Sequence, residues 1–168
     1  MKKRNLKIPF IRPEELATDT AGSNDVILHA LDFYSKKGVF YDAVLLLQPT
    51  CPFRIKNDFK NLLNLFNEDT EIVVSVKLAS ENPYFNLFEE NHAGFLEKSK
   101  EGDFERRQDC PPVYAYNGSL YLIRVKSLQK NHLHQLTKIK KMMMPSQRSV
   151  DIDTYADWLL IEYYLDKY

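Results

Sequence analysis

Hydrophobic positions recur along the chain with two different periods, which predict alternating helices and strands. Residues 23–37 carry apolar side chains three and four positions apart, as on one face of a helix, and residues 57–67 repeat this pattern behind a polar capping residue. Between them, Ala43–Leu47 is a short continuous apolar run, typical of a strand covered on both faces of a parallel sheet. Glu71–Lys77 is a second such run, rich in β-branched residues, so the order strand, helix, strand predicts a right-handed crossover between parallel strands.

The middle of the chain has a different pattern. Residues 82–109 are polar and aromatic with only weak alternation, and we interpret them as short hairpin-like strands and loops. Residues 113–123 read as a strand that is interrupted or turned at Asn117-Gly118, a dipeptide that tolerates positive φ. An irregular, β-rich insertion is therefore expected within the alternating pattern.

The final third predicts one more strand and one more helix. Residues 138–144 read as a short strand whose lysines occupy the wet face of a sheet edge. Residues 154–168 read as a terminal helix with three inward side chains, Trp158, Ile161 and Leu165. The sum is an α/β fold, expected as a single domain over residues 1–168.

Composition and charge narrow the class of protein. The 168 residues are 44% hydrophobic and 27% charged, as in a folded globular domain, and 23 basic residues balance 23 acidic ones. No net field draws the whole protein to nucleic acid or to a membrane, so neither is expected as a partner. Two cysteines are too few for a disulfide framework, and neither a secretory signal nor a long apolar run is present, which leads us to expect a cytoplasmic protein.

A candidate ligand loop follows the first predicted strand. Gln48 and Thr50 come directly after it, at the end of the sheet where open α/β folds bind their ligands. The amide of Gln48 could read the edge of a nucleotide base, and neighbouring prolines stiffen the loop. A purely structural loop explains this motif equally well. Only five glycines occur in the chain, and they form no glycine-rich phosphate loop of a common pattern.

An aspartate pair precedes the last predicted helix. Asp151 and Asp153 alternate in an extended segment, which places their side chains on one side and roughly 7 Å apart. Two carboxylates suffice for Mg²⁺, which keeps several waters and binds phosphate oxygens. Helix capping competes with this interpretation, because Thr154 and Asp157 have the spacing of a capping box. From the pattern alone, capping is the favoured account, although it does not require Asp151.

Arginines supply candidate anion-binding groups. Arg106, Arg107 and Arg148 lie close to these motifs, and a guanidinium group binds a carboxylate or phosphate with two hydrogen bonds. Exposed arginines are more often simply solvated, so none of the three is assigned from its position alone.

Four separated blocks, IPFIRPEELATDTAGS, LLLQPTCPFR, RRQDCPPVYAYNGSLYLI and MPSQRSVDIDTYADW, stand in an order and at distances that resemble the acylneuraminate cytidylyltransferases, or CMP-sialic acid synthetases. The resemblance spans nearly the entire chain. It implies a Rossmann-like three-layer sandwich with a mainly parallel sheet, of the nucleotide-diphospho-sugar transferase type. It also raises the metal interpretation of the aspartate pair above capping.

The resemblance implies transfer of CMP from CTP to a sialic acid or a related nonulosonic acid, with release of pyrophosphate and with Mg²⁺ as cofactor. No catalytic residue, and no general base, is assigned. The matched positions imply nucleotide-binding roles for Ser23, Gln48 and Thr50, sugar-acid-binding roles for Gln48, Arg107 and Asn117, and metal-binding roles for Asp151 and Asp153.

The resemblance also carries expectations about assembly and about departures from the family. Residues 82–107 match a segment that helps two subunits pair, so a homodimer is expected. Members of the family open with a strand and a glycine-rich basic loop that cradles the triphosphate, whereas this chain begins after that point, so an N-terminally truncated domain of impaired activity is expected. The alternatives are a non-catalytic remnant or dimer partner of a complete synthetase and, less favoured, a metal-dependent nucleotide-sugar glycosyltransferase, whose aspartate pair would follow a mid-domain strand.

Overall fold

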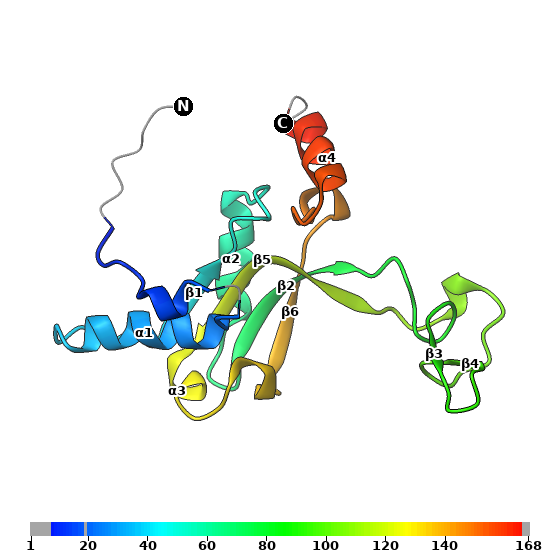
Figure 1. Cartoon of the computed structure of the whole chain (residues 1–168), viewed down its shortest axis with the longest axis horizontal. Helices are drawn as coiled ribbons and strands as arrows, with labels where there is room; N and C mark the ends of the chain where they lie inside the picture. Colours follow the sequence, from blue (N-terminus) through cyan, green and yellow to red (C-terminus); the bar gives the residue numbers. More distant parts are fainter. Residues whose placement is uncertain (1–7, 19, 166–168) are drawn as a thin grey trace.

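A computed structural model describes residues 8–18 and 20–165 and places a mixed four-stranded sheet at the centre of an α/β fold (Figure 1). The α/β class predicted from the sequence is confirmed. The strands of this sheet, in the spatial order β1-β5-β2-β6, are β1 (Ala43–Leu47), β5 (Tyr114–Arg124), β2 (Ile72–Leu78) and β6 (Ile139–Met143).

Strand directions differ from the expectation of a mainly parallel sheet, which is not confirmed. β5 runs antiparallel to both of its neighbours, β1 and β2, and only β2 and β6 form a parallel pair. Because β1 and β2 both oppose β5, they run in the same direction, and the predicted crossover joins them with β5 inserted between. A short apolar run indicates a strand but carries no information about the direction of its neighbour.

The strands β1 and β2 differ in how deeply they are buried. Residues 72–76 of β2 are buried, as expected for a central strand. β1 is an edge strand whose outer side pairs with nothing in the described part of the chain, and Leu45 and Leu47 are exposed. The prediction that β1 is covered on both faces is therefore wrong, because helix α1 (Ser23–Ser35) packs only on the face that holds Val44 and Leu46.

Helices cover both faces of the central strands. Ile27 of α1 and Leu128 of α3 (Val125–Leu128) join the alternate β2 residues 72, 74 and 76 in one core cluster. Leu62 of α2 (Lys56–Leu65) packs with Val73 on the other face. This alternation is the period-two signature of a strand buried on both sides.

The segment from residue 82 to residue 112, called the arm below, projects from one end of the sheet (Figure 1). Its base is closed by the hydrogen bond that the Asn82 side chain donates to the Pro111 carbonyl, 3.0 Å. It contains the antiparallel hairpin of β3 (Phe88–Glu90) and β4 (Leu96–Lys98), which confirms the hairpin prediction.

Helix α4 (Tyr155–Leu165) stands off the sheet on one side (Figure 1). Ile161 is 4% exposed, as predicted, but Trp158 is 48% exposed and Leu165 is exposed as well. The prediction that those two side chains point inward is wrong for a single chain. The helix projects from the sheet and contacts the rest of the fold only along a narrow stripe. Residues 166–168, the end of the predicted helix, lie outside the described residues.

Among residues 8–18 and 20–165, no helix is both long enough and apolar enough to cross a bilayer.

Candidate functional site

A wide bulge in β5 forms the floor of the site. Val74 pairs with Tyr121 and Val76 with Tyr116, so residues 117–120 oppose the single residue between them on β2. Gly118 lies at φ +71°, a conformation that glycine adopts without strain. The interruption predicted at Asn117-Gly118 is thus a bulge within one continuous strand.

The side chain of Asn117 is the centre of a buried polar network. It is 2% exposed, and its oxygen accepts hydrogen bonds from the Ser75 hydroxyl (2.6 Å) and the Ser119 N–H (3.2 Å). Its amide nitrogen donates to the Ser149 hydroxyl (2.8 Å) and faces the Met144 sulfur (3.4 Å). All four hydrogen-bonding positions of the amide are used internally. In this conformation Asn117 joins the bulge to the segment that carries Asp151, and its predicted contact with the sugar acid stays a prediction.

Asp151 lies directly over the bulge. A Cβ atom added at Gly118 would stand 2.5 Å from the Asp151 Oδ2 and 3.5 Å from the Gln48 Oε1, so these three residues meet at one point. The Asp151 Oδ1 is buried and has no hydrogen-bond partner among the described residues. A buried carboxylate oxygen without a donor is costly, and a bound cation would remove that cost. The residues present therefore fit a divalent metal ion.

The loop between β1 and α2 is fastened to the same place. The Ile152 N–H donates to the Thr50 carbonyl oxygen at 3.0 Å, which sets the aspartate segment beside the predicted ligand loop. Arg54 fastens the loop from the other side. Its Nη1 donates to three main-chain carbonyl oxygens, those of Gln48 (2.7 Å), Cys51 (2.7 Å) and Ser119 (3.3 Å). Sequence reasoning missed Arg54, although a lone arginine at the end of a proline-stiffened loop after a strand was a usable signal.

Two ionisable side chains beside the carboxylate are held neutral. Burial is the largest cause that raises the pKa of the Cys51 thiol, and the negative charge of Asp151 adds to it. Burial is also the largest cause that raises the pKa of the Tyr121 hydroxyl, and the negative charge of Asp151 is the second. The raised pKa of Cys51 is in keeping with a packed, protonated thiol at its buried position.

The capping interpretation and the metal interpretation apply to different residues. Thr154 donates to the Asp157 Oδ2 from its N–H (2.8 Å) and its hydroxyl (2.7 Å), and the Asp157 N–H donates back to the Thr154 Oγ1 (3.3 Å). This reciprocal box caps α4, as predicted for these two residues. The exposed Asp153 remains available to a ligand. Within the described ranges, no group of three histidines, cysteines or acidic residues could hold a metal, so any ion here takes further ligands from water or substrate.

Replacement of Thr154 with alanine is expected to loosen the start of α4 by about 1 kcal/mol, because the cap loses its hydroxyl. Hydrogen bonds from Thr154 hold the pKa of Asp157 below its usual range. The cap's contribution is therefore complete above the ordinary aspartate pKa and is lost as the pH falls through the lowered value. Amide exchange in the first turn of α4, followed from neutral to acidic pH, should show a larger loss in the parent chain than in the variant, in which the backbone N–H groups of residues 153 and 154 still donate to Asp157. An equal acid response in both proteins would contradict it.

The structure does not bring Ser23 and Arg107 into this cluster. Ser23 is the exposed first residue of α1, and none of the contacts above reaches it. Arg107 is exposed in the short 3-10 turn Arg107–Asp109 on the arm, which Figure 1 shows set apart from α4 and the segment before it. Their predicted binding roles stay predictions.

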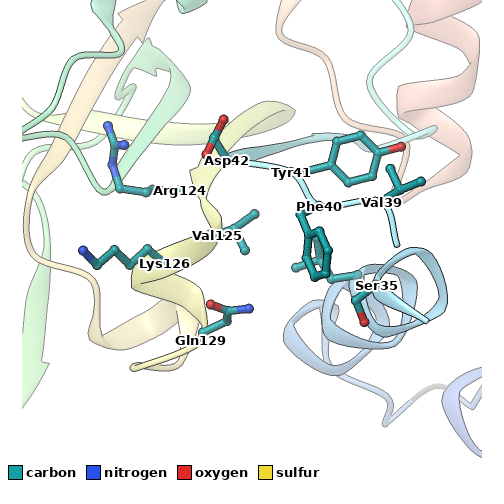
Figure 2. A pocket seen from close by; sticks show the side chains of 10 residues that line it. Ser35, Val39, Phe40, Tyr41, Asp42, Arg124, Val125, Lys126 and Gln129 are labelled. Atoms are coloured by element: carbon teal, nitrogen blue, oxygen red, sulfur yellow. The ribbon is translucent and has the colours of Figure 1, made fainter. Parts of the chain in front are cut away.

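A pocket between α1 and α3 lies at the opposite end of β1 from Gln48 (Figure 2). Its polar side chains do not converge: Arg124 and Lys126 extend away from Phe40. Arg124 is engaged elsewhere, since its guanidinium donates to the Thr70 carbonyl oxygen at 2.8 Å and stacks on a phenylalanine ring. We assign this pocket no chemistry.

Alanine at position 118 should damage both the fold and the site. The positive φ alone costs a residue with a Cβ about 1–2 kcal/mol, and the new methyl would overlap the carboxylate of Asp151. We expect a lower urea midpoint together with a Mn²⁺ affinity reduced by about tenfold. Gly94, which has a positive φ of 81° but open space around it, provides the control: Gly94→Ala should carry the backbone cost without the loss of metal. Equal Mn²⁺ affinity in the parent chain and Gly118→Ala would contradict this geometry.

Comparison with known proteins agrees with the motif blocks. No family model matches the chain. It is 31% identical over 156 residues to the CMP-N,N'-diacetyllegionaminic acid synthase of Legionella pneumophila, an alignment that covers 92% of this chain and 67% of that protein. It is 28% identical to the post-translational flagellin modification protein B of Campylobacter coli, over 92% of this chain and 66% of that protein. It is 27% identical to an N-acylneuraminate cytidylyltransferase of Streptococcus agalactiae, over 94% of this chain but 37% of the relative.

The chain thus spans about two thirds of the length of the first two relatives and little more than a third of the streptococcal one. Nearly all of this chain is aligned in each case. The chain belongs to the family of the N-acylneuraminate cytidylyltransferases and CMP-nonulosonic acid synthases.

Proposed function

We propose that this chain transfers CMP from CTP to a nonulosonic acid of the sialic type and releases pyrophosphate, on a fold of the nucleotide-diphospho-sugar transferase type. The names of its relatives support the reaction class. The observation that carries the proposal is the carboxylate of Asp151: its Oδ2 lies over Gly118 near Gln48, and its buried Oδ1 has no hydrogen-bond partner among the described residues.

Asp151 is the proposed principal metal ligand, with Asp153 as the second. A bound Mg²⁺ would supply neutralisation of phosphate charge, the main requirement of phosphoryl-type transfer. The chain's own contribution is placement: Gln48, held by Arg54 through its carbonyl oxygen, presents an amide beside the carboxylate for the nucleotide. Thr50 and Ser23 complete the proposed nucleotide-binding set, and the proton acceptor for the sugar hydroxyl is not assigned.

A homodimer is part of the proposal. Arg107 suits the carboxylate of the sugar acid, yet it lies on the arm, which is set apart from α4 and the segment before it within one chain (Figure 1). We therefore propose that the arm of a second copy supplies this arginine. The arm exposes Phe88, Phe95 and Leu96, which are suitable for burial between two subunits.

Pyrophosphate release from CTP, with Mg²⁺ and with neuraminic, legionaminic or pseudaminic acids as acceptors, tests the reaction. CMP-sugar should form with at least one acceptor, UTP should be a poorer donor, and Asp151→Asn should reduce turnover strongly. Robust turnover in the variant would exclude the metal assignment. A stable dimer that shows no CTP binding in calorimetry would contradict the enzyme proposal and favour a non-catalytic partner.

A further inference from the structure

A buried ion pair joins two distant parts of the chain next to the site. Arg148 and Asp58, 90 residues apart, form a two-pronged salt bridge, with Nη2 donating to Oδ1 at 3.0 Å and Nη1 donating to Oδ2. Their side chains are 17% and 5% exposed. Asp58, in the first turn of α2, also accepts the Ile55 N–H at 2.9 Å, and Arg148 also donates to the Phe53 carbonyl oxygen at 3.2 Å.

Arg148 lies three residues before Asp151. The carbonyl oxygen of Arg148 accepts the weak thiol hydrogen bond of Cys51 at 3.7 Å, and the Ile152 N–H reaches Thr50. The short segment from residue 148 to residue 152 is thus attached to the β1–α2 loop at both of its ends. Asp151 is the residue within it whose Oδ1 has no partner in the described chain.

We propose that Asp58 and Arg148 are positioning residues: their ion pair holds the segment 148–152 against the β1–α2 loop and so fixes the carboxylate of Asp151 over Gly118. The part of this proposal that concerns metal affinity rests on the proposed function; the part that concerns the segment's attachment does not.

Energetics favour positioning over a purely stabilising role. A buried ion pair gives little net stability because both charges lose their hydration, so its main effect here is to fix geometry. The chain offers a matched comparison on its surface. Arg106 forms a similar two-pronged pair with Asp109, at 2.8 and 3.0 Å, with side chains 67% and 42% exposed, on the arm and apart from this segment within one chain.

Amide hydrogen exchange at Ile152 tests the attachment. Asp58→Asn removes the charge with little change of shape, Arg148→Met removes the donor fork, and Arg106→Met is the control. We expect Ile152 to exchange about tenfold faster or more in the first two variants, beyond any change in the β2 amides that report global opening, and to be unchanged in the control. Acceleration no larger than that of β2 would overturn the proposal. If Arg148→Met fails to fold, Arg148→Lys replaces it: this variant keeps the positive charge but loses the two-pronged guanidinium contact, and the same acceleration of exchange at Ile152 is expected.

Mn²⁺ titration followed by electron paramagnetic resonance tests the consequence for the carboxylate. Loss of a residue that orients a metal ligand typically weakens binding by about 10–100-fold, and we expect this in the folded Asp58→Asn and Arg148→Met proteins but not in Arg106→Met. Affinity equal to that of the parent chain would refute positioning of Asp151. If the parent chain binds no Mn²⁺, the metal assignment under the proposed function fails, while exchange at Ile152 still decides the attachment.

Discussion

Asparagine at position 151 is expected to weaken divalent-metal binding on the order of 100-fold, because the site loses its central negative charge. The metal-free fold should change by less than about 1 kcal/mol, since the Oδ1 of Asp151 makes no hydrogen bond within the described chain that the substitution could break. Mn²⁺ titration and urea denaturation on the same preparations measure the two effects.

The same substitution at two other aspartates provides comparisons for Asp151→Asn. Asp153→Asn should weaken Mn²⁺ by a smaller factor, about tenfold, because Asp153 is exposed and water screens its charge. Asp32→Asn, on the surface of α1 and paired with Lys36, should leave the affinity unchanged. Mn²⁺ binding of parental strength in Asp151→Asn would show that the ion binds elsewhere.

Alanine at position 117 is expected to give the largest loss of stability, about 3–5 kcal/mol in urea denaturation. The substitution removes an amide whose oxygen and nitrogen form hydrogen bonds with Ser75, Ser119 and Ser149. Each partner loses one buried hydrogen bond, and the desolvation cost of a group that finds no replacement exceeds the net value of the bond itself. The Ser75 and Ser149 hydroxyls keep their bonds to the Leu120 and Pro145 carbonyl oxygens.

Asn91 provides the matched control. Its side chain also makes several hydrogen bonds, to the N–H groups of Ala93 and Phe95 and to Glu97, but in the exposed turn of the β3–β4 hairpin. Water can replace these bonds, so Asn91→Ala should cost less than about 1 kcal/mol. Similar losses for the two variants would argue that the network around Asn117 is not the dominant source of stability at the bulge.

The individual elements were predictable because their signals are local. The apolar run that became β1 coincides with the strand in the structure, and the Thr154–Asp157 spacing predicted the cap of α4. Sheet order was not predictable in this way. The position of β5 between β1 and β2 depends on pairing between residues far apart in the sequence, and no periodicity within one segment records it.

The same distinction between local and long-range signals applies to the candidate site. Position after a strand singled out Gln48, and the aspartate pair before the last helix, together with the resemblance, singled out Asp151; the structure brings the two residues together. Arg54 had a local signal in its position at the end of the loop, because two of its three contacts lie within that loop. The pairing of Asp58 with Arg148 joins side chains 90 residues apart, and no local pattern predicts it. Asn117 was assigned as a binding residue from the resemblance, and only the fold shows how completely its amide is occupied.

Among the described residues no strand pairs with the outer side of β1, and this has a consequence for the handling of the protein. Free backbone N–H and C=O groups beside the exposed Leu45 and Leu47 form a template on which another extended chain can add. Concentrated preparations should accordingly form soluble aggregates through strand addition, at a rate that rises with protein concentration. Lysine at position 45 or 47 would interrupt that template at a surface position, and it offers a practical route to samples suitable for spectroscopy and crystallisation.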